Sequence, residues 1–212
     1  MKLPEKTIER LSEYRRTLFN CFSNGKTHIY SHELAKLHSN TAVQVRRDLM
    51  LIGFSSLTKK GYDVKELIDL ISKILDSRDG QNVAVIGMGN LGKAITAYFN
   101  GKRSKLNIKA AFDIDPDKIG AQQSGVSCYH IDEFNEIVKR ENITIAVITA
   151  SPSSTPFLAD LIEKAGIKGV LNFTSTPINF SENVYHEEYD MITSLEKVAY
   201  FVKERSLKRK SV

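Results

Sequence analysis

Apolar positions in the first quarter of the chain recur at helical spacing. A first helix opens near Pro4 and ends before Asn24-Gly25. Its apolar positions are Ile8, Leu11, Leu18, Phe19 and Phe22. A short second helix begins at Ser31, and a third begins near Thr41 and ends at Gly53. The third helix has its buried stripe at Ala42, Val45, Leu49 and Ile52. A hairpin over residues 54–62 and an amphipathic helix over 64–75 follow, which predicts a winged helix-turn-helix.

From residue 82 onward the hydrophobic pattern changes to short apolar runs. Predicted strands are 82–86, 108–112, 143–148 and 169–173, and predicted helices are 91–99, 132–140 and 154–165. Alternating strands and helices of this kind form a doubly wound parallel sheet, so we predict an α/β Rossmann domain. Asp79-Gly80 marks the boundary between a first domain over 1–79 and a second that starts at residue 80.

A glycine-rich turn follows the first predicted strand of this second domain. Gly87, Gly89 and Gly92 stand in G-x-G-x-x-G order, and a helix opens directly after them. Gly87 permits the tight turn, Gly89 lets the backbone approach a pyrophosphate, and Gly92 allows close helix–strand packing. Helix N-terminal amides then face the phosphates. The cofactor-binding turn is predicted to comprise Gly87, Met88, Gly89, Asn90, Leu91 and Gly92.

Asp113 ends the second predicted strand of the Rossmann domain, 26 residues after Gly87. A carboxylate there can accept hydrogen bonds from the adenosine ribose and repels a 2′-phosphate, which favours NAD(H) over NADP(H). Lys118 is close to Asp113 in sequence, so binding of NADP(H) stays an alternative. A second alternative is that Asp113 only caps a helix in a tight turn. A third contact is expected where the 143–148 strand ends, at Thr149, Ala150 and Ser151.

Charge is distributed unevenly along the chain. Its net charge of +5 divides into +6 over residues 1–62, −5 over 63–202 and +4 over the last ten residues. A basic first domain attached to an acidic second one is typical of nucleic-acid binding. In the third helix Arg can bind guanine and Gln can bind adenine. The predicted DNA contacts are Thr41, Gln44, Arg46 and Arg47 on this helix and Lys59 and Lys60 at the hairpin tip. The alternative is a solvated, charged helix face.

Composition excludes several other classes of protein. No apolar run is long enough to cross a membrane, and the N-terminus lacks the apolar region of a secretory signal. The two cysteines, Cys21 and Cys128, are too few for a disulfide framework or a four-thiolate zinc site. We therefore expect a cytoplasmic protein without a bound metal.

With both halves in view, the chain resembles the Rex family of bacterial redox-sensing transcriptional repressors. The motifs that carry the resemblance are LSEYRRTL, QVRRDL, GYDVKEL, GMGNLGKA, AAFDIDPDKIG, AGIKGVLNF and YDMITSLEKVAYFV. The resemblance implies a homodimer in which a C-terminal helix, at about 193–206, swaps between nucleotide domains. It divides the remaining chain into a Rossmann domain over 80–192 and a dimerisation segment over 193–212. It also implies that NAD⁺ permits binding to double-stranded operator DNA and that NADH releases it.

Four residues match the family at positions where the charge of the nicotinamide ring can be sensed. Tyr98 follows the glycine turn and Asp190 precedes the swapped helix. Arg16, in the first domain, is expected to pair with Asp190 or to contact DNA, and Met191 to enter the partner's nicotinamide pocket. An exposed ion pair for Arg16 and core packing for Tyr98 and Met191 are the alternatives.

The chain departs from the family pattern in two places. The family wing carries a glycine-flanked Lys-Arg pair, whereas this chain reads FSSLTKKGY, a departure that bears on the groove contacts and on the operator sequence. The family's Val-Pro-Ala after the fourth strand is Ala150-Ser151-Pro152 here. 

Two other functions compete with a repressor. An NAD-dependent dehydrogenase needs a proton donor or acceptor beside the nicotinamide. Of five histidines, three lie in the first domain, and His130 and His186 have no obvious partner, so catalysis is not expected. A module resembling the CoA-binding domains of acyl-CoA ligases would leave the winged helix unexplained.

Overall fold

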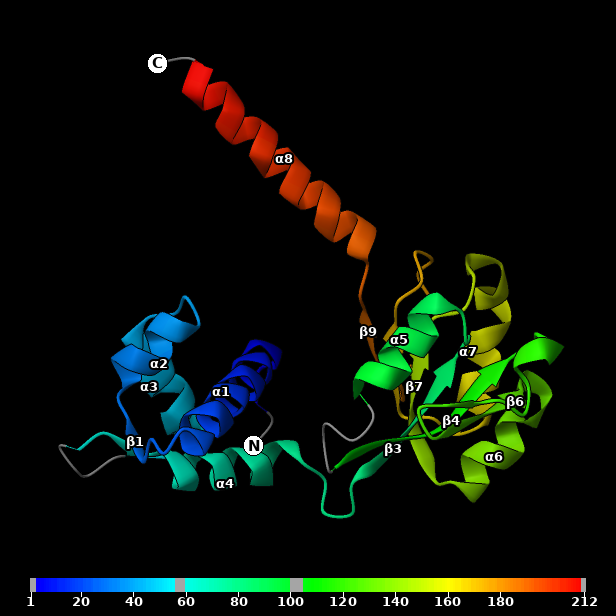
Figure 1. Cartoon of the computed structure of the whole chain (residues 1–212), viewed down its shortest axis with the longest axis horizontal. Coiled ribbons are helices and arrows are strands. Elements are labelled where there is room, and N and C mark those ends of the chain that lie inside the picture. Colours follow the sequence, from blue (N-terminus) through cyan, green and yellow to red (C-terminus); the bar gives the residue numbers. More distant parts are fainter. Residues whose placement is uncertain (1–2, 56–59, 100–104, 211–212) are drawn as a thin grey trace. The chain divides into compact units, whose positions relative to one another are not determined.

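The computed structural model describes residues 3–55, 60–99 and 105–210 (Figure 1). The chain divides into two compact units, Met1–Arg78 and Asp79–Val212. Within the described residues, no helix combines the length and the apolar character needed to cross a membrane.

Helices dominate the first unit, and one small antiparallel strand pair accompanies them. Its helices are α1 (Glu5–Ser23), α2 (Ser31–Leu37), α3 (Ala42–Leu51) and α4 (Val64–Leu75). Strands β1 (His28–Ile29) and β2 (Tyr62–Asp63) pair with each other. Helix α1 packs against α4, and α2 against α3. Thr41 caps α3 by accepting a hydrogen bond from the Gln44 amide, and Asp63 caps α4 in the same way. The helix-turn-helix prediction is confirmed.

Two details of the first unit differ from the sequence prediction. Leu11 and Leu18 are buried together with Tyr14, but Ile8, Phe19 and Phe22 are exposed. The buried side of α1 is therefore narrower than its apolar content indicated. In the segment 54–62, Tyr62 pairs with Ile29 rather than with another part of the segment, so the wing pairs with the stretch before α2. Residues 56–59 lie outside the described residues.

The second unit is built on a sheet whose strand order, over the described residues, is β5-β6-β4-β3-β7-β8-β9. All neighbouring strands are parallel except β5 and β6. The strands are β3 (Gln81–Ile86), β4 (Leu106–Asp113), β5 (Gln122–Gln123), β6 (Val126–His130), β7 (Ile143–Ile148), β8 (Gly169–Asn172) and β9 (Tyr185–Glu188). The chain runs outward from β3 in one direction and then from β7 in the other. This is the Rossmann order, with its switch point between β3 and β7.

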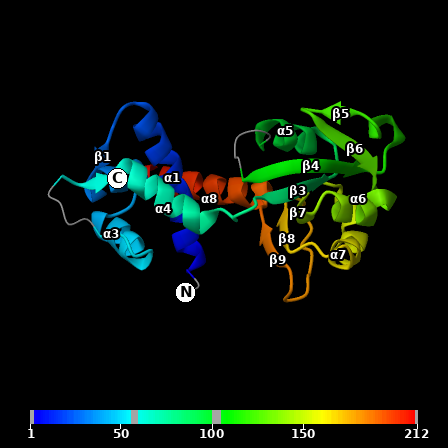
Figure 2. The ribbon, with the colours of Figure 1, turned by 90° about the horizontal axis from the view of Figure 1, so that it is seen from below.

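Helices cover both faces of this sheet (Figure 2). They are α5 (Asn90–Phe99), α6 (Phe134–Arg140) and α7 (Thr155–Lys164), with short 3₁₀ helices at Pro116–Lys118, Ile131–Glu133 and Pro152–Ser154. Ala84 and Ile86 face α6 and α7, whereas Val83 and Val85 face Ile95 of α5. Because side chains alternate along a strand, one apolar run fills both cores. The predicted doubly wound α/β fold is confirmed.

The sequence reading missed β5, β6 and β9. Strand β9 is exposed at every position, so it carries no apolar alternation that could identify it. Helix α8 (Met191–Lys210) follows. Its exposed apolar side chains are Met191, Ile192, Leu195, Val198, Tyr200, Phe201 and Val202.

Candidate nucleotide and DNA sites

The glycine turn between β3 and α5 shows why each glycine stands where it does. Gly87 has φ +96°, and a Cβ there would lie 2.6 Å from the Ala150 nitrogen. A Cβ on Gly92 would lie 2.0 Å from the Gly87 carbonyl oxygen. A Cβ on Gly89 would meet nothing within 4 Å. Two glycines are thus required for packing within the protein, and the third leaves open space beside the first turn of α5. 

Asp113, at the end of β4, connects this strand to the glycine turn. Its Oδ2 accepts a hydrogen bond from the Met88 amide at 2.6 Å, and its Oδ1 accepts from the amides of Ile114 and Asp115 at 2.9 and 3.0 Å. Lys118 Nζ lies 3.2 Å from Oδ2. Burial alone would raise the pKa of Asp113, but the two backbone amides of Asp115 and Met88, with Lys118, outweigh it and lower that pKa. The carboxylate is therefore charged at neutral pH.

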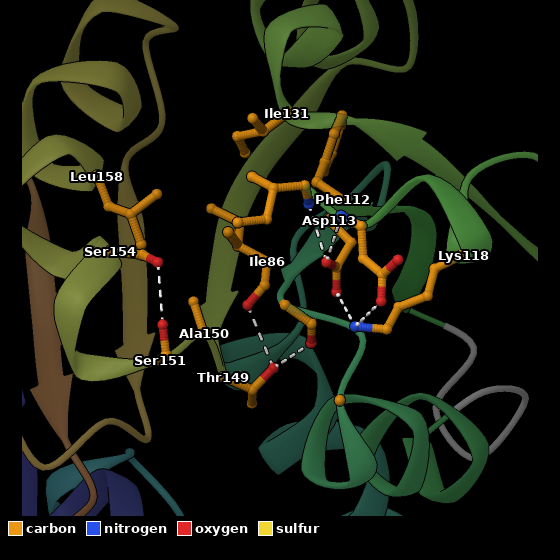
Figure 3. Close-up of a pocket in the computed structure, with 14 residues that line it drawn as sticks. Ile86, Phe112, Asp113, Lys118, Ile131, Thr149, Ala150, Ser151, Ser154 and Leu158 are labelled. Carbon is orange, nitrogen blue, oxygen red and sulfur yellow. Dashed lines mark hydrogen bonds and ion pairs between the residues drawn. The ribbon is translucent and has the colours of Figure 1, made fainter.

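A pocket of about 410 Å³ lies at the carboxyl ends of β3, β4 and β7 (Figure 3). This volume is in the range of small-molecule sites. Its lining residues are Ile86, Gly87, Gly89, Phe112, Asp113, Ile114, Asp115, Lys118, Ile131, Thr149, Ala150, Ser151, Ser154 and Leu158. Charged groups stand at one side, around Asp113 and Lys118, and Ile131 and Leu158 supply apolar surface elsewhere (Figure 3). 

The predicted contact after β7 is part of the same pocket. Thr149 Oγ1 donates to the Gly87 carbonyl at 2.7 Å, so its hydroxyl holds the glycine turn against β7. Ala150 and Ser151 line the pocket beside it. Ser151 Oγ forms a hydrogen bond with Ser154 Oγ at 3.1 Å. The end of β7 and the glycine turn are thus one connected wall of the pocket.

Several lining residues had no signal in the sequence. Leu158 and Ser154 fell within the predicted helix over 154–165, and Ile131 came just before the predicted helix over 132–140. Asp115 stands two residues after Asp113 in the DIDPDK run, and this spacing was the one available hint that a second carboxylate faces the pocket. 

Three predicted cofactor residues outside the glycine turn do not line this pocket: Tyr98, Asp190 and Met191. Tyr98 is an exposed side chain in the last turn of α5 and contacts the Phe99 ring edge-on. Asp190 caps α8: it accepts hydrogen bonds from the Ile192 amide at 2.8 Å and from Thr193 Oγ1 at 2.6 Å. These hydrogen bonds, that from Thr193 first, lower the pKa of Asp190. Met191 is exposed.

On α3 the exposed side chains form one face. They are Val43, Arg46, Arg47, Met50 and Leu51, which recur at helical spacing. Arg46 Nη1 donates to Ser31 Oγ at 3.2 Å, which links the two helices of the helix-turn-helix. Val43, Met50 and Leu51 were not predicted as part of this face, for which only polar residues were named. Thr41 is exposed at the start of the helix.

Asp48 is a charged residue outside the predicted apolar stripe of α3, and its side chain is nevertheless fully buried. Arg10 of α1 donates to both carboxylate oxygens, each at 2.7 Å. Tyr14 Oη donates at 3.1 Å and Gln44 Nε2 at 3.0 Å. Burial raises the pKa of Asp48, and the hydrogen bonds from Arg10 and Gln44 outweigh it, so the pKa is lowered. Gln44, a predicted base-reading residue, is thereby tied to this cluster.

The other predicted DNA residues are basic and come from different elements. Arg16 is exposed on α1. Lys60 is exposed just before β2, and Lys59 lies outside the described residues. Arg16 belongs to the first unit and Asp190 to the second.

Comparison with known proteins covers both units. Residues 2–49 match the family model "Putative DNA-binding protein N-terminus", and residues 78–176 match "CoA binding domain". The redox-sensing transcriptional repressor Rex of Anoxybacillus flavithermus is 35% identical over 95% of this chain and 95% of its own length. Rex of Carboxydothermus hydrogenoformans is 36% identical over 95% of this chain and 97% of its own length.

Solved structures match over the whole chain as well. A structure of RSP in complex with β-NAD⁺ and operator DNA has a TM-score of 0.90 and 31% identity, covering 99% of this chain and 97% of RSP. RSP in complex with β-NADH has a TM-score of 0.86 and 31% identity over the full length of both chains. The relatives are named as repressors, which confirms the prediction of a regulator rather than a dehydrogenase. The chain belongs to the Rex family of redox-sensing transcriptional repressors.

Proposed function

We propose that this protein represses transcription by binding operator DNA as a homodimer, and that NADH in place of NAD⁺ releases it. The observation that carries the proposal is the pairing, in one chain, of a basic helix-turn-helix with a glycine-lined nucleotide pocket. RSP, similar over 99% of the chain, binds β-NAD⁺ together with operator DNA. We place the protein in the cytoplasm, where both ligands occur.

The second unit fits a dinucleotide at the switch point of its sheet. Gly89 leaves room for a pyrophosphate beside the first turn of α5, whose amides are oriented toward an anion. Leu158 and Ile131 provide apolar surface suited to the adenine ring. The nicotinamide end is assigned to the remaining predicted residues: Tyr98 of one protomer beside the ring, and Met191 from the partner.

DNA binding is assigned to the exposed face of α3 and the basic residues around it. We assign base reading to Arg46 and Arg47, which are exposed on α3. We assign phosphate contacts to Thr41, Lys59 and Lys60. Val43 is suited to apolar contact with a thymine methyl group. Gln44 donates one N–H to Asp48 and keeps a second N–H and its carbonyl oxygen for adenine.

A homodimer would account for two apolar surfaces, of which one is exposed and the other half-buried. Helix α8 presents apolar side chains along its length, including Leu195, Val198 and Phe201. On the α5 side of the sheet, Leu171 and Phe173 remain half-buried. Exposed apolar surface of this extent marks an interaction site. We propose that residues 193–212 of one protomer, which include most of α8, pack against the nucleotide domain of its partner.

The redox switch is assigned to Asp190 and Arg16. Asp190 caps α8 through Ile192 and Thr193 and is charged at neutral pH. A carboxylate at this position can give up its hydrogen bonds to the start of α8 and bind a cation instead. Oxidised nicotinamide carries a positive charge and reduced nicotinamide does not, so we propose that the redox state of the ring decides which partner Asp190 binds. We propose Arg16 as this cation. In one redox state it pairs with Asp190, and in the other it contacts DNA.

A binding screen tests the function. A labelled library of duplex DNA is incubated with the protein at fixed salt, with NAD⁺ or NADH added. We expect specific binding that NADH weakens more than NAD⁺ does. The double variant Arg46→Ala/Arg47→Ala should lose DNA binding and keep NADH binding. Lys164→Ala, an exposed lysine of the second unit, is the control for lost charge. Absence of specific DNA binding in both redox states would refute the repressor function.

A further inference from the structure

The carboxylate of Asp113 is fully engaged within the protein. It accepts four hydrogen bonds: from the amides of Met88, Ile114 and Asp115 and from Lys118 Nζ. A carboxylate offers about four acceptor positions in total. A ribose hydroxyl can bind Asp113 only by displacing one of these donors. Three of the four are backbone amides fixed by the fold, so this residue is poorly suited to read a ligand.

Asp115 lies two residues further on and differs in each of these respects. Its side chain is 41% exposed, against 9% for Asp113. Oδ1 accepts from the Asp117 amide at 3.1 Å, and Oδ2 lies 3.2 Å from Lys118 Nζ. About two acceptor positions of its carboxylate therefore stay available. Asp115 and Lys118 both line the pocket.

Lys118 joins the two aspartates. Its Nζ lies 3.2 Å from both Asp113 Oδ2 and Asp115 Oδ2, and its side chain is 29% exposed. An ammonium group has three N–H donors, so one N–H stays available beyond these two contacts. A diol with one hydroxyl donating to Asp115 and the other accepting from Lys118 would satisfy both groups.

We infer that Asp115, together with Lys118, binds the adenosine ribose hydroxyls of NAD(H), and that Asp113 is a positioning residue that holds the glycine turn against β4. This assignment rests on the proposed function. Two carboxylates surround a single ammonium group, so the site has a net negative charge. A 2′-phosphate is repelled there in spite of the lysine, which makes Asp115 the residue that selects NAD(H) over NADP(H).

The charge states of Lys118 and Asp113 support this assignment. The hydrogen bonds that Lys118 donates to Asp113 and then to Asp115 raise the pKa of Lys118, although burial opposes them. The pKa of Asp113 is lowered, as described above. Both groups are therefore charged near neutral pH, and the negative balance of the site persists there.

The test measures dissociation constants of the full-length protein by NADH fluorescence, which suits a chain without tryptophan. The ligands are NADH, its 2′-deoxyadenosine analogue and NADPH. Wild type should bind the deoxy analogue about tenfold more weakly than NADH. Asp115→Ala should bind NADH about 10- to 100-fold more weakly, discriminate little between NADH and the deoxy analogue, and bind NADPH better relative to NADH. Asp117→Ala removes an exposed charge from the same loop and should match wild type within about twofold.

The variant Asp113→Asn distinguishes a residue that binds the ribose from one that only holds the glycine turn in place. It should lower the melting temperature of the free protein and weaken NADH and the deoxy analogue by the same factor. If Asp113→Asn loses the discrimination while Asp115→Ala keeps it, the assignment is wrong. If Asp113→Asn does not fold, wild-type discrimination in Asp115→Ala alone overturns it. If wild type binds neither NADH nor NAD⁺, the nucleotide-sensing function itself fails, and the assignment fails with it.

Discussion

The two units of the chain each contain a buried aspartate whose carboxylate accepts four hydrogen bonds. The hydrogen-bond donors differ between the two units. Asp48 in the first unit is held by side chains only, from Arg10, Tyr14 and Gln44. Asp113 in the second unit is held by three backbone amides and one lysine. The first cluster fixes how α3 lies on α1, whereas the second fixes the course of a loop.

This difference determines which changes each site tolerates. A cluster of side chains depends on the identity of every member, because Arg10 and Tyr14 supply three of the four donors to Asp48. A cluster of backbone amides depends on the path of the chain, which is set by glycines and by close packing. We therefore expect side-chain substitutions to act most strongly in the first unit, and glycine substitutions in the second.

The largest effect is expected for Asp48→Ala. Removing a buried carboxylate leaves Arg10 and Tyr14 without their acceptor, at a cost of about 3 kcal/mol to the first unit. Amide hydrogen exchange followed by mass spectrometry reports each unit separately and should show faster exchange in α1 and α3. Glu9→Ala is the control, because Glu9 forms an exposed pair with Lys6 and should change stability by less than about 0.5 kcal/mol. A loss below about 1 kcal/mol for Asp48→Ala would contradict the role of the cluster.

Glycine substitutions in the second unit should come next in size. Gly92→Ala forces a Cβ to within 2.0 Å of the Gly87 carbonyl oxygen, so backbone must move, at a cost of about 2–3 kcal/mol. Gly89→Ala meets nothing within 4 Å and should leave the free protein as stable as wild type. It should still weaken NADH binding, because the methyl group occupies the space proposed for the pyrophosphate. Chemical denaturation and NADH titration distinguish the two variants. Equal destabilisation by both would show that the turn is not packed as described.

The same contrast explains which features of the fold could be predicted from the sequence. The pattern of apolar residues located α4 at residues 64–75 and β7 at residues 143–148. One buried face sets the period of α4, and burial on both faces makes β7 a continuous apolar run. Glycines at fixed spacing located the turn at 87–92. Neither pattern carries information on which side chains meet across elements. Asp48 reads as a polar surface position because Arg10 lies 38 residues away in sequence.

Asp113 shows the corresponding limit for a site. The sequence placed it correctly at the end of a strand beside the glycine turn. The number of backbone amides that donate to this carboxylate could not be predicted, because it depends on the path of the chain from Asp113 to Asp115. Ile131 and Leu158 were missed for a related reason: they reach the pocket only through the packing of the sheet.

A moderate effect is expected from acid. The pKa values of Asp48 and Asp113 are both lowered in the folded protein. Their contribution to stability is therefore fully present above the unfolded carboxyl pKa of about 3.9, and it is lost as pH falls through that value toward the folded pKa. Hydrogen exchange or denaturant unfolding between about pH 6 and pH 3 should show both units losing stability toward the acid end.

Asp113→Asn should reduce this acid dependence in the second unit and leave it in the first. Asp48→Asn should do the reverse, because each substitution removes only its own titrating group. An unchanged acid dependence in both variants would mean that other carboxylates govern the response. Stability that increases toward low pH would contradict the lowered pKa values themselves.

The smallest effect is expected for Lys118→Gln, and it sharpens the comparison most directly. Lys118 contributes one of four donors to Asp113, at 3.2 Å and with a 29% exposed side chain, whereas Arg10 contributes two of four to Asp48, each at 2.7 Å. Without Lys118, three backbone amides still stabilise the Asp113 carboxylate. We expect a loss below about 1 kcal/mol in the second unit, reduced further by added salt. Arg10→Gln should cost about 2–3 kcal/mol in the first unit, because Asp48 then remains buried without a cation. Equal losses for the two substitutions, measured by denaturant unfolding, would show that the backbone amides do not replace the missing charge, and that both aspartates depend on their cations alike.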